Sequence, residues 1–400
     1  MTGTSKYQGS CFNLKAMRLR LILMLTGLII LSACNILETL TNANGNAGPV
    51  GTGDPGPVPG SREVRLWPFS SASIWNTPIG SKAEYVPSGL QADPYWGSFA
   101  QEIVVVMTPE APLTDVYENL KDWSDPSVGA RCLKEGVGNA EPKLITRLPM
   151  PNDWTYPHEG RLPDGVAAIM LPDKRTVYQT QPFHRCLAGS YATSHYEYDK
   201  VDIYGDGRLG AHGGSGLSSL GGTIRKGELL RQGSIRHAMK VSVNNKLYLA
   251  YNDDGSGGYR WPARKSDGGA ITNYQGKVLA LEMGALLALK PDFDVLQLRT
   301  EPARIIATAF KNYGAYVVDE TAGQMVILNL ERGPAGRVKD EFKGEWGYEF
   351  DQAKSRPNGN AFGEDMAKLW PALQVVNNNT PNNVGGGGSP IVERAPEVKP

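Results

Sequence analysis

The stretch Val166–Gln181 reads VAAIMLPDKRTVYQTQ, and it decides the fold class. Its two β-prone runs, 166–171 and 176–181, flank the tetrad Pro-Asp-Lys-Arg, whose residues favour a tight turn. We therefore expect an antiparallel hairpin. The composition agrees, because Gly (47 of 400 residues) and Pro (28) are too frequent for a fold built from long helices.

Further β patterns follow this hairpin in the chain. In 235–243 one set of alternate residues is mainly apolar (Ile235, His237, Met239, Val241 and Val243), and the other set is mixed (Arg236, Ala238, Lys240 and Ser242). This period of two predicts a half-buried strand. The pair Asn244-Asn245 predicts a turn into another strand at 246–251, and 315–318 and 325–330 have the composition of two more strands.

One convincing helix is predicted at Pro302–Tyr313, with Thr300 as its N-cap, a proline in its first turn and Gly314 as its stop. The sequence contains no internal repeat of fixed period, which disfavours propellers and solenoids. The expected fold is therefore mainly β: a single β-sandwich or jelly-roll-like domain with few helices.

The N-terminal segment has the pattern of an export signal. A basic region that begins at Met17 precedes an apolar run, 21–31, about half as long as a membrane span. We assign 1–33 to a signal peptide, in which 1–16 is a candidate for a mis-called extension. The run leads into Leu-Ser-Ala-Cys34, which resembles a bacterial lipoprotein signal. An ordinary signal peptide with a chance cysteine is the alternative.

The lipoprotein pattern predicts lipidation of Cys34 and a membrane contact through this anchor alone. Because Asn35 stands where Asp would favour inner-membrane retention, we expect the exported protein at the cell surface or outer membrane. Residues 34–60 end in a stretch with six Gly and four Pro, which predicts a flexible tether. The expected globular domain is 61–376, and 377–400 is expected to be a disordered tail.

Two cysteines remain after removal of Cys11 and lipidation of Cys34. Cys132 and Cys186 form an even pair in an exported chain, which predicts a disulfide. Neither of them has the CxxC or CxxH spacing of a metal site. We therefore favour the disulfide over a metal-binding role.

The charge balance excludes nucleic acid as a partner. The full chain holds 41 basic and 41 acidic residues, and removal of the signal peptide leaves 37 basic against 41 acidic ones. No basic block remains that could neutralise a phosphate backbone.

Histidines are the sharpest chemical signal, because four of the five lie within 54 residues: His184, His195, His212 and His237. Neutral imidazole suits proton transfer near neutral pH. His237 has apolar neighbours in its strand pattern, so a core role competes there. His195 opens the run SHYEYDKVDIYGDG (194–207), whose polarity on both faces predicts a groove or a sheet edge. The candidate catalytic residues are His195, Tyr196, His212, Arg236, His237 and Asp202.

Residues 211–218, AHGGSGLS, form a glycine-rich stretch in which the backbone can approach a ligand closely. The GxSxG hydrolase pattern fails at Leu217, and no Lys-Ser/Thr follows for a phosphate loop. Asp199, Asp202 and Asp206 leave a structural Ca²⁺ open, although the closing Glu of a calcium loop is absent. We otherwise expect no metal site and no cofactor.

A short aromatic and basic segment suits sugar binding. Tyr259-Arg260-Trp261 places a guanidinium between two rings that can stack on a sugar, although Trp261 is equally suited to a core. The candidate substrate-binding residues are Tyr259, Arg260, Trp261 and Arg225.

Four blocks of the sequence resemble a family of secreted, largely uncharacterised bacterial proteins. They are GGTIRKGEL (221–229), IRHAMKV (235–241), YRWPARKSDG (259–268) and ARIIATAFKNYGAYVVDE (303–320). The resemblance extends over most of 61–376. It implies a single β-rich extracellular domain in glycan-related surroundings, and it assigns no catalytic residue.

The leading functional hypothesis is a surface-tethered enzyme that degrades a carbohydrate polymer, most concretely a polysaccharide lyase. Such a lyase needs a base, an acid and a cation to neutralise a uronate, for which His195, Tyr196, His212 and Arg236 are the candidates. The first alternative is a glycoside hydrolase with two carboxylates taken from Asp202, Asp206 and Glu228. The second is a non-catalytic glycan-binding or structural surface lipoprotein.

Overall fold

The computed structural model describes residues 62–92, 99–121, 125, 127–137, 140–159, 164–321, 323, 326–351 and 361–398. The predicted signal peptide, the lipidation site at Cys34 and the tether lie outside these residues. Within the described ranges, no helix is long and apolar enough to cross a membrane.

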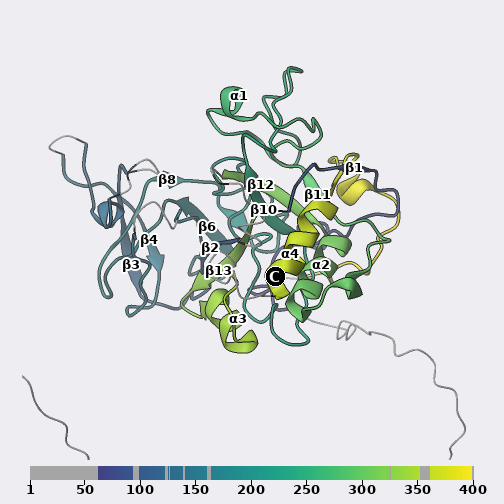
Figure 1. Cartoon of the computed structure of the whole chain (residues 1–400). Helices are drawn as coiled ribbons and strands as arrows, with labels where there is room; N and C mark the ends of the chain where they lie inside the picture. The colour runs from purple at the N-terminus through teal and green to yellow at the C-terminus, as the bar shows by residue number, and fades with distance from the viewer. Residues whose placement is uncertain are drawn as a thin grey trace, which may run out of the picture. The chain divides into compact units, whose positions relative to one another are not determined.

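The predicted mainly-β class is confirmed: 26% of the described residues are in strands and 15% in helices. A large mixed sheet runs through the molecule (Figure 1) in the order β1 (Tyr85–Pro87), β15 (Gln374–Val376), β11 (Leu286–Ala288), β12 (Ala315–Thr321), β10 (Met239–Asn244), β13 (Val326–Gly333), β2 (Phe99–Val106), β5 (Ala167–Met170), β6 (Thr176–Gln181) and β8 (Tyr196–Glu197). β14 (Gly336–Arg337) pairs with β13, and β9 (Val201–Asp202) pairs with β6. A second sheet has the order β4 (Leu144–Pro149), β3 (Leu113–Glu118) and β7 (Ala192–Ser194).

The predicted hairpin is confirmed in its strands and its register. β5 and β6 are antiparallel, with Ala167 opposite Thr180. Asp173 fixes the turn between them, because its Oδ1 accepts hydrogen bonds from the backbone N–H groups of Arg175 (3.0 Å) and Thr176 (2.8 Å).

The strand predicted at 235–243 is shifted and more deeply buried than expected. β10 begins at Met239 rather than Ile235, and every one of its six residues is buried. The prediction of a half-buried strand was therefore wrong, because β10 lies in the middle of the sheet with parallel β12 on one side and antiparallel β13 on the other.

The turn expected after β10 is present, but the strand predicted at 246–251 does not form. The side chain of Asn244 accepts a hydrogen bond from the N–H of Leu247 (2.8 Å), and its carbonyl accepts one from Tyr248 (3.0 Å). These local bonds turn the chain away from the sheet, so the segment has no strand partner.

Three helices, α2 (Glu301–Asn312), α3 (Val338–Trp346) and α4 (Ala361–Ala372), cover one face of the large sheet at its β10–β13 region (Figure 1). A short helix, α1 (Ala270–Asn273), lies apart from them, and 3₁₀ turns occur at Ala130–Cys132, Val295–Gln297 and Val384–Gly386. Phe310 of α2 meets Trp370 of α4 edge to face, and their ring centroids are 6.2 Å apart, within the ~4.5–7 Å typical of aromatic pairs. Both rings belong to the core that contains Val241 and Val317 of the sheet.

The same face is covered by the second sheet at its β2–β5–β6 region. Val116 and Leu148 of the three-stranded sheet share a core with Val104 and Ile169 of the large one. This sheet-on-sheet packing fits the predicted β-sandwich character.

The helix predicted at Pro302–Tyr313 is confirmed as α2, and Gly314 ends it with a φ of 76°. Thr300 occupies the N-cap position, but its side chain does not cap the helix. Its backbone N–H and hydroxyl instead donate to Oδ2 of Asp365 on α4, at 2.8 and 2.9 Å. This bond joins the two helices at their ends.

The disordered tail predicted at 377–400 was wrong for its described part. Residues 377–391 hydrogen-bond with 79–84, including Gly80 N–H to Gly385 O (2.8 Å) and Ile391 N–H to Ile79 O (3.0 Å). The glycines permit this close packing: a Cβ at Gly80 would lie 2.0 Å from the carbonyl oxygen of Gly387. The folded part therefore extends to residue 398 in the described chain.

Candidate functional site

A row of buried polar side chains crosses the face of the large sheet opposite the helices. Alternation along the strands places them there: residues of β10 such as Val241 and Val243 contact the helical core, and their neighbours point the other way. The row consists of Gln179 on β6, Gln101 on β2, Asn329 on β13, and Lys240 and Ser242 on β10. Because buried polar groups need partners, this row requires a polar cover.

A β-bulge turns Asp319 toward the same face. In the parallel pair of β10 and β12, Val241 is opposite Val317, whereas Ser242 is opposite Asp319, so Val318 is the extra residue. Without this insertion, Asp319 would alternate onto the other face, with Val317. The bulge therefore aims a carboxylate at the polar row.

The glycine-rich loop (Ala211–Ser218) and the residues after it cover the row. Lys240 Nζ donates to the carbonyls of Ser218 (3.1 Å) and Ser219 (2.7 Å). Gln179 Oε1 accepts from the N–H of Ser219 at 2.8 Å, and its Nε2 donates to Leu209 O at 2.9 Å. Buried side chains of the sheet thus hold the loop by its backbone.

Two carboxylates meet at Gly214 in this loop. A Cβ at Gly214 would lie 2.8 Å from Oδ2 of Asp267 and 2.9 Å from Oδ1 of Asp319. The Asp319 side chain is 21% exposed, so solvent reaches the pair. We call Gly214, Asp267, Asp319 and the neighbouring His212 the Gly214 site.

The environment of the Gly214 site favours protonated carboxyls. Burial raises the pKa of Asp319 to about 7. Burial, followed by the charge of Asp319, raises the pKa of Asp267 to about 6. The hydroxyl of Tyr274 donates to Asp267 Oδ2 at 2.5 Å and opposes this rise by stabilising the charged form. Asp267 therefore differs from Asp319 in having the Tyr274 hydroxyl as a hydrogen-bond donor.

A third carboxylate borders the site. Asp164, three residues before the start of β5, accepts a hydrogen bond from Nε2 of Gln101 at 2.6 Å. Burial and the charge of Asp319 raise its pKa to about 7.

His212 lies behind Asp319 and is completely buried. Its Nδ1 is 3.5 Å from Oδ2 of Asp319, and its Nε2 has no hydrogen-bond partner. Burial and the nearby Lys240 lower the pKa of His212 well below its ordinary value, so the imidazole is neutral. Of the predicted catalytic residues, His212 is the one that the structure brings to the carboxylates.

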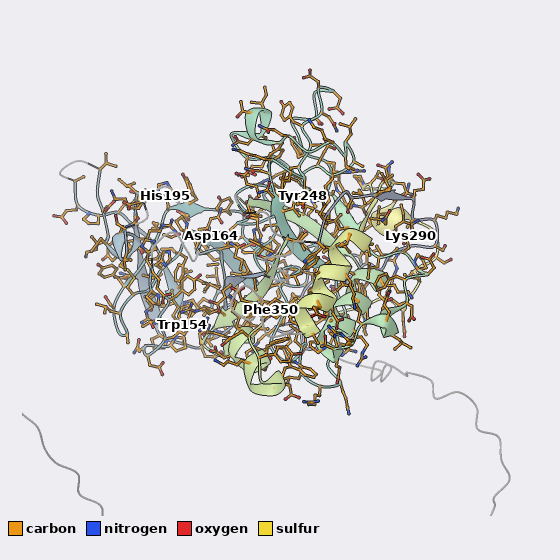
Figure 2. The ribbon with its side chains drawn as sticks, viewed as in Figure 1. Trp154, Asp164, His195, Tyr248, Lys290 and Phe350 are labelled. Carbon is orange, nitrogen blue, oxygen red and sulfur yellow. A yellow bond between two sulfur atoms is a disulfide. The ribbon has the colours of Figure 1, made fainter. Side chains whose placement is uncertain are left out.

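His195 and Tyr196 lie instead at the β8 edge of the large sheet (Figure 2). His195 Nδ1 is 2.7 Å from the carbonyl oxygen of Asn119, and its ring meets the Tyr196 ring edge-on at 3.9 Å. The prediction of a sheet edge is confirmed for this run. No described contact joins His195 to His212.

His237, Arg236 and Arg225 are each held in separate contacts. His237 is buried and its Nε2 lies 3.1 Å from Glu228 Oε1; burial opposes its charged form, but Glu228 raises the pKa of the imidazole. Arg225 pairs with Glu331 at 2.8 Å in the interior, and Arg236 stacks over Trp67 at 5.1 Å. These contacts explain the three side chains as parts of the fold.

The carboxylates of the acidic run have protein partners in the structure. Asp202 pairs with Arg175 at 2.6 Å, Asp199 pairs with Arg264, and Asp206 accepts from the N–H of Arg208 at 3.2 Å. Among the described residues, no group of three or more His, Cys, Asp or Glu side chains is placed to hold a metal ion.

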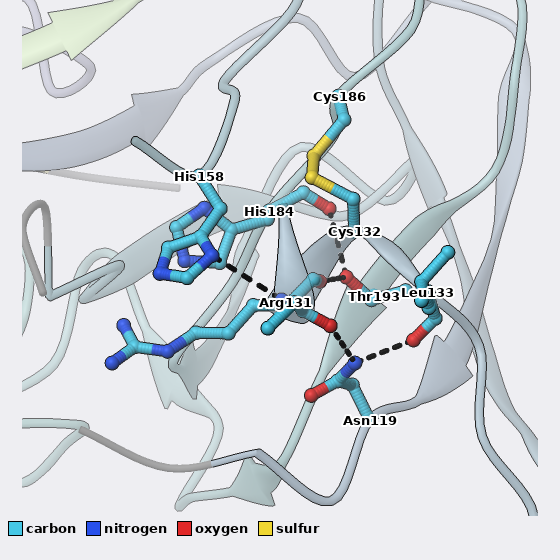
Figure 3. Close-up of a disulfide and its surroundings, with 9 residues drawn as sticks. Asn119, Arg131, Cys132, Leu133, His158, His184, Cys186 and Thr193 are labelled. Carbon is cyan, nitrogen blue, oxygen red and sulfur yellow. Dashed lines mark hydrogen bonds between the residues drawn. A yellow bond between two sulfur atoms is a disulfide. The ribbon is translucent and has the colours of Figure 1, made fainter. Parts of the chain in front are cut away.

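The predicted disulfide is confirmed, with Cα atoms of Cys132 and Cys186 5.6 Å apart (Figure 3). Beside it lies His184, whose ring centroid is 5.0 Å from that of His158 and 5.4 Å from that of Tyr156. Burial, then the His158 charge, lowers the pKa of His184 to about 3. With about 1% of its surface exposed, His184 is a packed core residue.

The predicted sugar-binding segment is divided between two roles. Trp261 packs against the core on the polar face of the sheet, and Tyr259 pairs with Met283. Arg260 lines a hollow of the described surface. Its Nη2 donates to the carbonyl oxygen of Asn377 at 2.6 Å.

Sequence reasoning missed Asp164, Asp267 and Asp319. Asp319 carried a readable signal, since it follows the apolar run Ala315–Val318 at the end of a predicted strand.

Compared with known proteins, the chain matches no protein-family model, no curated protein and no solved structure.

Proposed function

We propose that this chain is a surface-anchored glycoside hydrolase in which Asp319 is the general acid and Asp267 is the nucleophile. The observation that carries this proposal is the meeting of the two carboxylates at Gly214 in a partly exposed site. The proposal keeps the two-carboxylate hydrolase chemistry but assigns it to other residues, because Asp202 and Glu228 are engaged in ion pairs elsewhere.

The difference in protonation supports the two roles. A general acid must keep its proton near neutral pH, and the pKa of Asp319 is about 7 because of burial. A nucleophile must be ionised, and the Tyr274 hydroxyl favours the charged form of Asp267. Pairs of carboxyls whose environments separate their pKa values are typical of glycosidases.

The spacing favours retention of anomeric configuration. Two oxygens that each lie within 3 Å of one point are at most about 6 Å apart, which suits the ~5–5.5 Å of retaining enzymes better than the ~6.5–9.5 Å of inverting ones. In the first step Asp319 gives its proton to the glycosidic oxygen, the bond from this oxygen to the anomeric carbon breaks, and Asp267 bonds to that carbon. In the second step Asp319 takes a proton from water, the resulting hydroxide attacks the carbon, and Asp267 leaves.

The surroundings suit a sugar and the predicted anchor suits a polymer outside the cell. Tyr198 lies near Asp319 and within reach of Lys265, whose Nζ is 5.9 Å from the tyrosine ring. A half-buried aromatic ring with hydrogen-bonding neighbours matches the mixed polarity of a sugar ring. Lipidation at Cys34 would hold the enzyme at the surface, and Cys34→Ala should release it into the medium.

The test compares Asp319→Asn and Asp267→Asn with the wild-type protein on a panel of neutral and acidic polysaccharides. Wild type should release reducing ends without absorbance at 235 nm, and each variant should lose about 100-fold or more in rate. Asp202→Asn, an exposed carboxylate in an ion pair, is the matched control and should keep full activity. A rise at 235 nm would indicate a lyase, and full activity in either site variant or none in the wild type would refute the proposal.

A further inference from the structure

A surface hollow lies beside the segment 282–283, which also borders the Gly214 site. Met283 extends its methyl group to 2.9 Å from the position of a Cβ at Gly214, while the preceding residue, Glu282, lines a depression of about 660 Å³. The walls of this depression are mainly aliphatic and include Val86, Pro87 and Leu279. We call it the Glu282 hollow.

Its polar side presents an acceptor that lacks a donor. Glu282 Oε1 accepts from Asn252 Nδ2 at 2.8 Å and from Ser256 Oγ at 3.1 Å, and no hydrogen bond of the described residues reaches Oε2. Since a carboxylate oxygen without a donor is available to a ligand, the hollow is suited to one that brings a hydroxyl donor.

The hollow is electrically balanced. Its two charged groups are the Glu282 carboxylate and the Arg260 guanidinium. Arg260 uses its terminal nitrogens to donate to the carbonyls of Ala280 (3.0 Å) and Asn377 (2.6 Å), so it holds the rim together. The described lining offers no free cation that could neutralise a uronate or a phosphate. A ligand without charge therefore suits the hollow better.

We infer that the Glu282 hollow binds a neutral sugar unit as a second carbohydrate site, separate from the Gly214 site. Ring hydroxyls would donate to Glu282 Oε2, while the C–H face of the ring packs on Pro87 and Leu279. The choice of carbohydrate rests on the proposed function, but the binding itself does not require catalysis. A second site that holds another part of the polymer increases the effective concentration of substrate at the first.

The test measures binding of neutral gluco- and manno-oligosaccharides by calorimetry, using the full chain with Asp319→Asn to prevent turnover. Glu282→Gln keeps the acceptor that Asn252 and Ser256 use and replaces the free acceptor by a donor, so it should weaken binding about tenfold or more. Leu279→Glu changes an exposed wall residue (65% accessible) and should weaken binding similarly without unfolding the chain. Leu296→Ala, equally exposed outside the hollow, is the control and should bind as the parent does.

A second measurement separates the two proposals. In the otherwise native protein, Glu282→Gln should raise KM for a long polymer several-fold and leave kcat on a short oligosaccharide unchanged. Failure of every neutral sugar to bind, tighter binding of oligogalacturonate than of neutral sugars, or unchanged binding in both hollow variants would overturn the inference. Loss of the hydrolase proposal would appear instead as activity that survives Asp319→Asn.

Discussion

Nδ1 of His212 lies 3.5 Å from Oδ2 of Asp319, and the imidazole is completely buried while the carboxylate reaches solvent. The histidine is neutral, because burial and Lys240 lower its pKa. It therefore supplies no charge to hold Asp319 ionised, and the carboxyl retains its raised pKa. In the proposed mechanism this neutral histidine therefore takes no part in proton transfer.

The first prediction concerns stability and pH. Because the pKa of Asp319 is about 7 in the folded protein, above the ~3.9 of an unfolded aspartate, the folded state binds this proton more tightly. Stability should therefore fall as pH rises from about 4 to about 7. Asp319→Asn abolishes this pH-dependent loss of stability. The Tm of the variant should therefore match that of wild type near pH 4 and exceed it by several degrees at pH 8. Thermal unfolding followed by circular dichroism checks this, and an equal difference at both pH values would contradict it.

The second prediction concerns Gly214. A methyl group there would come within 3.0 Å of Asp267, Asp319 and the Met283 methyl, so at least one carboxylate must move. Gly214→Ala should reduce hydrolysis about tenfold or more, since small displacements of reacting groups are costly. Gly268→Ala has nothing within 4 Å of its new methyl and serves as the control. Equal rates in the two variants would show that the carboxylates do not act at this position.

The third prediction concerns the pH profile. Hydrolysis should rise as Asp267 ionises, with a pKa of about 6, and fall as Asp319 loses its proton, with a pKa of about 7. Tyr274→Phe removes the hydrogen bond that favours the charged form of Asp267, so the acidic limb should move to higher pH. Initial rates from pH 4 to pH 9 measure the shift. Tyr251→Phe should leave the limb in place, and an acidic limb unmoved by Tyr274→Phe would exclude Asp267 as its source.

The fourth prediction concerns the disulfide. Cys132 and Cys186 close a loop of 54 residues, for which the chain-entropy estimate is about 4 kcal/mol. Replacing both by Ser should lower Tm by roughly 6 °C, at about 1.5 °C per kcal/mol for a domain of this size. The folded variant should hydrolyse substrate at the wild-type rate, because the bond lies beside the His158 and His184 core. A reductant should lower the Tm of wild type only; an unchanged wild-type Tm would show that the bond adds no stability.

Local chemistry explains what the sequence could predict. The hairpin follows from the turn chemistry of Pro172 and Asp173, and α2 follows from Pro302 in its first turn and Gly314 after its end. In both cases the determining residues are neighbours in the chain. Such signals do not depend on the rest of the fold.

The Gly214 site could not be predicted in the same way. Asp319 faces the loop only because of a bulge between two strands, and Asp267 arrives from a different segment. The histidine cluster in the sequence was misleading for the same reason: His184 and His237 lie near His212 in the chain but have other partners. Alternation along a strand assigns faces only until the first irregularity.

The C-terminal segment shows how composition can mislead. Its Asn and Gly content predicts disorder, yet Asn378 Nδ2 donates to Lys82 O (2.8 Å) and Gly386 O (3.0 Å). Asparagine side chains thus supply bonds that a strand would make with its backbone.

This packing of 377–391 on 79–84 also sets the order in which the molecule can be completed. The partners of Gly80 are about three hundred residues further along the chain. The backbone groups of 79–84 therefore lack these partners until residue 391 has been synthesised. Contacts of such long sequence separation slow folding, because a large loop must close before they form. Until these contacts form, the backbone groups of 79–84 lack their native partners, and exposed unpaired backbone of this kind favours aggregation.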